Sequence, residues 1–175
     1  FSRLDCDDEW SFEDLHRGID SSLNVVWNHL KYTCEVKKEY GSLPPVQCLL
    51  SQLNQIFLNL LVNAADAIES KGTITIRTGT QGDEAWVEVA DTGRGIPPDN
   101  LRRIFDPFFT TKAVGKGTGL GLSVSYSIVQ KHNGRIEVDS TVGQGSRFRV
   151  WLPLQQPARE VPGAPAAASA REVRG

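Results

Sequence analysis

The chain has 175 residues, and its 19 lysines and arginines nearly balance its 21 aspartates and glutamates. This length can bury the core of one ordinary domain, and the slightly negative net charge of −2 argues against a surface that binds nucleic acid. No apolar run approaches the roughly 20 residues that span a membrane, and no signal peptide is present, so we expect no direct membrane contact and a cytoplasmic location.

The N-terminal part of the chain alternates between strand and helix patterns. An edge strand is expected near Trp10, and a helix with a continuous apolar face is expected over residues 14–32. Residues 34–40 roughly alternate and indicate a strand, which glycine and proline break at residues 41–45. A long helix is expected over residues 49–70, where a glycine follows.

The C-terminal part contains two hairpin patterns with two helices between them. The expected strands pair as residues 73–80 with 85–91, and as residues 135–140 with 146–152. The expected helices cover residues 98–105 and 119–132. Because two hairpins exclude a purely parallel sheet, we predict a two-layer α/β (α+β) sandwich, in which a mixed sheet is covered on one face by about three helices.

The helix over residues 49–70 is apolar around most of its circumference but carries one narrow polar stripe. Spacings of three and four place five side chains on this stripe: Gln52, Gln55, Asn59, Asn63 and Asp66. A helix this apolar should be buried, and a buried amide or carboxylate without a partner costs about 2–7 kcal/mol. A core helix with satisfied amides is one interpretation, but five aligned polar groups favour a wet cavity that holds a ligand.

A glycine-rich run before the last predicted helix is the second candidate site. Gly115, Gly117, Gly119 and Gly121 alternate with Lys116, Thr118 and Leu120. A helix N-terminus offers unpaired N–H groups and partial positive charge to a phosphate, and lysines would add charge. A flexible surface loop is the alternative interpretation. A P-loop string is absent, and the glycines do not directly follow a strand as a dinucleotide fold requires.

Four segments in chain order resemble the ATP-binding catalytic domain of sensor histidine kinases, within the GHKL superfamily that also contains gyrase, MutL and large chaperones. Residues 55–67 (QIFLNLLVNAADA) are similar to the N box, 91–96 (DTGRGI) to the G1 box, 105–109 (FDPFF) to the F box and 117–122 (GTGLGL) to the G2 box. The resemblance covers about residues 10–154 and is greatest to the nitrogen-regulator type of kinase. It implies the GHKL ATP-binding fold with an ATP lid.

The resemblance implies a site for ATP and Mg²⁺. Asn63 would bind the Mg²⁺ that bridges the phosphates, with Asn59 as a second candidate ligand. Asp91 would accept a hydrogen bond from the adenine amino group, and would repel the carbonyl that guanine presents there. The other nucleotide-binding candidates are Asp66, Gly93, Gly95, Ile96, Phe105, Lys112, Lys116, Gly117, Thr118, Gly119, Leu120 and Gly121. The catalytic candidates are Asn59, Asn63 and Lys112, and Phe105, Phe108 and Phe109 would anchor the lid.

The resemblance also implies that the γ-phosphate goes to a histidine on a separate dimerisation domain, in a motif that begins His-Glu or His-Asp. None of the three histidines, His16, His29 and His132, begins such a motif. We therefore expect a monomeric catalytic domain that does not phosphorylate itself. Its partners would be its own dimerisation and histidine-phosphotransfer domain and a downstream response regulator.

We expect the chain to divide into three segments. Residues 1–9 would be the end of the dimerisation helix and a linker, residues 10–154 the ATP-binding domain, and residues 155–175 a Pro/Ala-rich disordered tail or linker. The chain contains no methionine, which leads us to expect part of a longer kinase. Its three widely spaced cysteines form no CxxC pair, so neither a zinc site nor a disulfide framework is expected.

Two other functions compete with the histidine kinase. The first is an ATPase-driven switch of the gyrase or MutL kind, in which a glutamate four residues before the magnesium asparagine is the base for water. That position is Asn59 here, which cannot accept a proton. The second is an anti-sigma-type serine kinase or a binding module without catalysis, against which the FDPFF segment argues.

Overall fold

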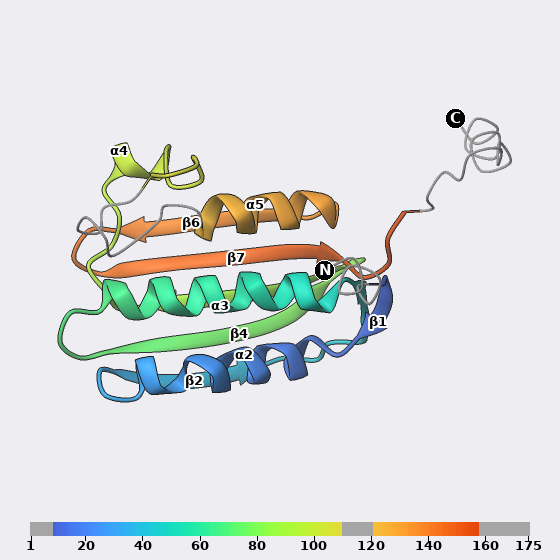
Figure 1. Ribbon diagram of the computed structural model, residues 1–175, viewed down its shortest axis with the longest axis horizontal. Helices are drawn as coiled ribbons and strands as arrows, with labels where there is room; N and C mark the ends of the chain where they lie inside the picture. Colours follow the sequence, from blue (N-terminus) through green and yellow to red (C-terminus); the bar gives the residue numbers. More distant parts are fainter. Residues whose placement is uncertain (1–8, 110–120, 158–175) are drawn as a thin grey trace, which may run out of the picture.

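The computed structural model describes residues 9–109 and 121–157, which form two layers, a sheet and the helices that cover it (Figure 1). The elements in chain order are β1 (Ser11–Glu13), α2 (Leu15–Leu30), β2 (Cys34–Tyr40), β3 (Val46–Cys48), α3 (Leu50–Ala67), β4 (Gly72–Gln81), β5 (Glu84–Asp91), α4 (Pro98–Leu101), α5 (Gly121–Lys131), β6 (Arg135–Thr141) and β7 (Gly145–Pro153). None of the helices in these two ranges is long and apolar enough to cross a membrane.

The main sheet has five strands in the order β2-β4-β5-β7-β6. β2 runs parallel to β4, whereas the other neighbouring pairs are antiparallel. Helices α2, α3 and α5 all lie on the same face of this sheet (Figure 1). The predicted two-layer sandwich with a mixed sheet and about three helices is therefore confirmed. The part of the predicted ATP lid that falls on residues 110–120 lies outside the described residues.

A second, two-stranded sheet pairs β1 with β3, and the sequence pattern missed β3. Three residues are too few for a periodicity to separate a strand from a turn. The segment is held instead by contacts distant in sequence, since the backbone N–H of Gln47 donates to the carbonyl of Leu154 at 2.9 Å. β3 is therefore formed by pairing with distant parts of the chain, and the local sequence does not indicate it.

Helices α3 and α4 end three and four residues before their predicted limits. α3 stops at Ala67 instead of residue 70 because Ile68 is extended, with φ −91° and ψ 115°, and its side chain is buried. α4 covers only the first four residues of the predicted helix over residues 98–105. The chain then turns tightly, with the N–H of Asp106 bonded to the carbonyl of Arg103, and Pro107 cannot continue a helix.

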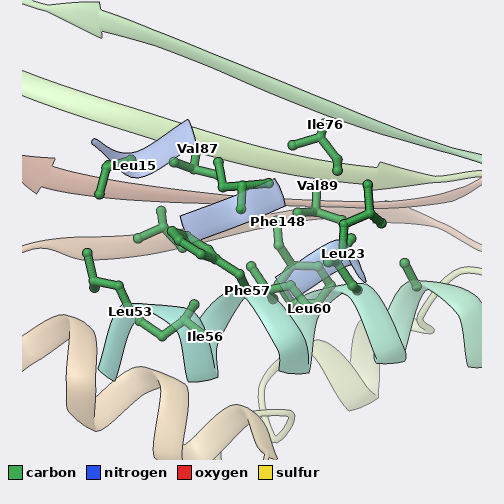
Figure 2. Packing of buried hydrophobic residues seen from close by; sticks show 14 of the residues in the cluster. Leu15, Leu23, Leu53, Ile56, Phe57, Leu60, Ile76, Val87, Val89 and Phe148 are labelled. Atoms are coloured by element: carbon green, nitrogen blue, oxygen red, sulfur yellow. The ribbon is translucent and has the colours of Figure 1, made fainter. Parts of the chain in front are cut away.

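The hydrophobic core lies between α3 and the central strands of the sheet. Figure 2 shows apolar side chains of the helix facing those of the strands: Leu53, Ile56, Phe57 and Leu60 on one side, and Ile76, Val87, Val89 and Phe148 on the other. Each such side chain contributes about 1.5–3 kcal/mol when fully buried. Because this packing fixes the apolar face of α3 against the sheet, it also fixes where the polar stripe of α3 points.

The other face of the sheet is closed by its own side chains. The register places charges of alternating sign in one row across all five strands: Glu39, Arg77, Glu88, Arg149 and Glu137. Glu88 is only 1% exposed and accepts hydrogen bonds from Arg77 at 3.0 Å and from Arg149 at 2.7 Å. The Arg149 guanidinium also lies 4.1 Å from the centroid of the Trp86 ring. This packing buries the middle of a face that none of the described helices covers.

Candidate functional site

The polar stripe of α3 contacts α5 through Asn59. Asn59 is half-buried, and its side-chain amide donates to the carbonyl of Gly121 at 3.0 Å and to the hydroxyl of Ser125 at 3.2 Å. Asn63 is half-buried one turn later on the same stripe. Asn59 therefore ties the stripe to the first turn of α5, the helix that follows the predicted lid.

Ser125 is a site residue that the sequence analysis missed. It is completely buried, and its hydroxyl receives the Asn59 amide. A serine among other serines on an amphipathic helix gives no distinctive signal, because its function depends on which helix packs against it. A buried polar position facing the stripe could have been found only by pairing the two helices first.

The turn after β5 positions Asp91. Asp91 is 8% exposed, and its Oδ1 accepts the backbone N–H of Gly93 at 2.8 Å. Burial raises the pKa of this carboxyl above its ordinary value, while hydrogen bonds from the backbone of Gly93 and Ser146 and the charge of Arg94 act in the opposite direction. A carboxylate has about four lone-pair sites, so these bonds leave it capacity for a ligand donor.

The same turn is docked on the C-terminal end of α3. The backbone N–H of Arg94 donates to the carbonyl of Ala67 at 2.9 Å, which satisfies one of the last carbonyls of the helix. A Cβ on Gly93 would lie 2.5 Å from the same carbonyl oxygen, so only glycine allows this approach. Asp91 and the stripe of α3 are thus brought to one end of the sheet, although 24 residues separate Ala67 from Asp91 in the sequence.

The loop of the second hairpin supports the turn from the other side. Gly95 has a φ of +80°, and a Cβ there would lie 2.3 Å from the carbonyl oxygen of Thr141. The N–H of Ile96 donates to the Ser140 hydroxyl at 2.8 Å. The sequence analysis expected Gly93 and Gly95 to let a base approach the backbone. The structure adds a packing requirement for glycine at both positions.

Phe105 and Phe108, two of the residues expected to anchor the lid, differ in their surroundings. The Phe105 ring lies 5.5 Å from that of Tyr126 on α5 and packs against the core, whereas Phe108 is 73% exposed and has a φ of 68°. Gly121 begins α5, and Asp66 lies three residues after Asn63 on α3. Six candidates fall outside the described residues: Lys112, Lys116, Gly117, Thr118, Gly119 and Leu120.

The donors that are described fit a nucleotide better than a metal bound by protein alone. Within residues 9–109 and 121–157, no three His, Cys, Asp or Glu side chains gather in a way that could hold an ion. Mg²⁺ commonly takes one or two protein oxygens and completes its shell with phosphate and water. The amide oxygen of Asn63 fits that pattern, and the turn that carries the buried Asp91 carboxylate docks on Ala67, four residues further along α3.

The chain is similar to proteins of known class. The family model described as histidine kinase-, DNA gyrase B-, and HSP90-like ATPase matches residues 49–156. The sensor kinase CckA of Brucella abortus is 43% identical over 155 residues, which cover 79% of this chain and 16% of CckA. This chain thus spans less than a fifth of that relative's length.

Two solved structures share the fold. The catalytic domain of the histidine kinase ThkA superposes with a TM-score of 0.76 at 28% identity, covering 84% of this chain and 97% of that one. Full-length ShkA in complex with AMPPNP gives a TM-score of 0.76 at 27% identity, covering 90% of this chain and 34% of that one. A family model that matches more than half of the sequence, together with the same fold, leads to one conclusion: the chain belongs to the histidine kinase-, DNA gyrase B- and HSP90-like ATPase family.

Proposed function

We propose that this chain binds Mg·ATP and donates the γ-phosphate to a histidine on a separate dimerisation domain, as part of a two-component signalling kinase. The observation that carries the proposal is the docking of the Asp91 turn on the end of α3, through the N–H of Arg94 and the carbonyl of Ala67. This contact brings a buried carboxylate to the end of the helix that carries Asn59 and Asn63. The similarity to sensor kinases and to the AMPPNP complex of ShkA supports the same conclusion.

Each residue has a separate task in this proposal. Asp91 accepts the adenine amino group, and the Asn63 oxygen binds Mg²⁺, which when bound offsets the charge of the phosphates. Asn59 holds the first turn of α5 through its two amide hydrogen bonds, so that this helix N-terminus keeps its place. Lys112, Lys116 and residues 117–121 supply the phosphate contacts.

Transfer to histidine is favoured over hydrolysis because the site has no base for water at residue 59. An amide cannot take a proton, and the amide nitrogen of Asn59 is already bonded to α5. Phosphoryl transfer depends mainly on positioning and charge stabilisation, so an acceptor brought in line with the γ-phosphate needs little further chemistry from this domain.

The acceptor is proposed to lie on another domain because each histidine of this chain is already engaged. His132 is fully buried and lies between the Ile128 carbonyl and the Leu49 N–H. His16 is hydrogen-bonded to Thr78 and stacked on Tyr40, and His29 is bonded to Asp66. We further propose a monomer in the cytoplasm, a response regulator downstream, and domain limits at residues 10 and 154.

The test measures binding and transfer separately. Calorimetry should detect Mg·ATP binding to the chain alone, and incubation with the dimerisation domain of its own parent protein should label that domain. The label should be acid-labile and base-stable, as a phosphohistidine is, and Asn63→Ala should abolish it. Rapid ATP turnover by the chain alone would support the ATPase switch instead, and an acid-stable label would support a serine kinase.

A further inference from the structure

Three polar residues form one row across neighbouring strands of the main sheet. The register places Asp91 of β5 opposite Ser146 of β7, and Ser146 opposite Ser140 of β6. The next row on the same face belongs to the hydrophobic core and consists of Val89, Phe148 and Val138. Three strands therefore change from apolar to polar side chains at the same level, at the end of the sheet where the Asp91 turn begins.

The Ser140 hydroxyl is the centre of a hydrogen-bond network in this row. It donates to the carbonyl of Gly145 at 3.0 Å, accepts the backbone N–H of Ile96 at 2.8 Å and lies 2.8 Å from the Ser146 hydroxyl. A carbonyl can only accept, so the single Ser140 proton goes to Gly145, and the Ser146 hydroxyl donates to Ser140. These three bonds use the one donor and two acceptor sites of a hydroxyl. The network therefore holds the Ser140 hydroxyl in one orientation.

Ser146 connects this network to Asp91. The backbone N–H of Ser146 donates to the Asp91 carboxyl, and this bond lowers the pKa of the carboxyl against the larger, raising effect of burial. Gly145, whose carbonyl Ser140 binds, packs so closely on the Asp91 backbone that a Cβ there would clash with the Asp91 carbonyl oxygen. Ile96 lies in the turn that follows Asp91. Ser140 thus contacts both of the chain segments that surround this carboxylate.

We propose that Ser140 is a positioning residue of the nucleotide site, which holds the Ser146 N–H and the turn at Ile96 in place around the Asp91 carboxylate. The inference rests on the proposed function, because it takes Asp91 as the acceptor of the adenine amino group. Ser140 acts through Asp91 and needs no contact with the ligand. Its effect is on recognition of the base, so the affinities for adenosine and for Mg·ATP should change by the same factor.

Calorimetry of the whole chain with adenosine and with Mg·ATP tests the inference. Ser140→Ala should weaken both affinities about three- to tenfold, the size expected for one intramolecular hydrogen bond. Ser140→Thr keeps the hydroxyl on a residue that suits a strand, and should stay within about twofold of wild type. Ser22→Ala is the matched control, because it removes a buried hydroxyl on α2 that donates to the Gly18 carbonyl at 2.9 Å. It should change neither affinity.

A pH profile separates this role from a purely structural one. When the Ser146 N–H is held less firmly, the charged form of Asp91 loses part of a donor and its pKa rises further. The fall of adenosine affinity on acidification should therefore begin at a higher pH in Ser140→Ala than in wild type, Ser140→Thr or Ser22→Ala. In the Asp91→Asn background, Ser140→Ala should cost much less affinity than it does in wild type, because the two residues act together.

An unchanged adenosine affinity and pH profile in Ser140→Ala would overturn the inference, and so would an undiminished loss in the Asp91→Asn background. If Ser140→Ala does not fold, Ser140→Cys, which has a similar shape and weaker hydrogen bonds, should show the same changes in the same directions. These negative results would leave the proposed function standing as long as wild type binds adenosine and Mg·ATP. Wild type that binds neither ligand would reject the proposed function as well.

Discussion

Asn59 on α3 donates its side-chain amide to the hydroxyl of Ser125 on α5 at 3.2 Å, and Ser125 is completely buried. The same amide reaches the carbonyl of Gly121 one turn earlier. Two hydrogen bonds from one side chain therefore fix the start of α5 relative to the stripe that carries Asn63. In the proposed mechanism this start of α5 faces the phosphates, so the contact links helix packing to ligand binding.

Ser125→Ala should lower the free energy of unfolding by about 1 kcal/mol, because it removes one acceptor of a partly buried amide. Alanine is the better helix former, which offsets a few tenths of this loss. Affinity for Mg·ATP should fall as well, since the first turn of α5 loses one of its two ties. Ser127→Ala, at an exposed position of the same helix, is the matched control; it should show only the small gain from helix propensity and leave the affinity unchanged. Equal effects of the two variants would mean that the Ser125 hydroxyl contributes nothing beyond the change in helix propensity.

The order and type of the long elements could be predicted because each has enough residues to show a period. Residues 34–40 were predicted as a strand, and β2 has these limits. The hairpin patterns around residues 81–84 and 142–145 gave the antiparallel pairs β4–β5 and β6–β7. β3 could not be predicted, because its three residues form a strand only through pairing with β1 and contact with Leu154.

The sequence indicates the candidate site only where a single helix, strand or turn carries the pattern. The stripe on α3 and Asp91 at the end of β5 can be read from periodicity and from the turn glycines. Ser125 could not be, because its contact depends on which helix packs beside α3, and helix packing leaves no signal in a single helix. The burial of Glu88 also leaves no signal in its own strand. Its place in the alternating pattern of β5 would suggest exposure, but arginine side chains from β4 and β7 cover it.

Glu88→Gln should destabilise the fold by about 1.5–3 kcal/mol, the range for hydrogen bonds to charged groups. The glutamate is 1% exposed, and its removal leaves Arg77 and Arg149 close together without the anion between them. Urea unfolding would measure the change. Glu39→Gln is the matched control, because Glu39 binds Arg77 in the same row but is 52% exposed, and it should cost at most about 1 kcal/mol. Similar losses in the two variants would mean that burial of Glu88 adds nothing.

His132→Phe should destabilise the chain by about 1–3 kcal/mol, although phenylalanine keeps the ring beside Trp10. The backbone N–H of Leu49, the N-cap residue of α3, donates to Nε2 of His132 at 3.1 Å. The apolar side chain of Leu49 makes no capping hydrogen bond, so the histidine supplies an acceptor for the N–H of this N-cap residue. Thermal unfolding of His132→Phe and of Lys131→Ala, an exposed neighbour, would test this. Unchanged stability in His132→Phe would show that packing alone holds this junction.

Asp91→Asn should separate binding from stability. The pKa of the Asp91 carboxyl is raised by burial, so the native state holds its proton more tightly than the unfolded chain does. The stability contributed by the protonated form is fully present below the ordinary pKa and is lost as pH rises through the raised value. Above that raised pKa the wild type carries a buried charge, which asparagine removes. We expect the melting temperature of Asp91→Asn to equal or exceed that of wild type at neutral pH, with the advantage disappearing in acid.

Nucleotide affinity should change in the opposite direction. Asparagine loses the charge that strengthens the hydrogen bond to the adenine amino group, so ATP and adenosine binding should both weaken by about 1–3 kcal/mol. In wild type the affinity should fall on acidification at a pH above that at which an ordinary aspartate titrates, because the raised pKa protonates Asp91 sooner. Calorimetry across pH should show this fall in wild type and in Asp83→Asn, an exposed control in the β4–β5 turn, but not in Asp91→Asn. If Asp91→Asn keeps wild-type affinity at neutral pH, Asp91 does not contact the base, and its buried charge must be retained for another reason.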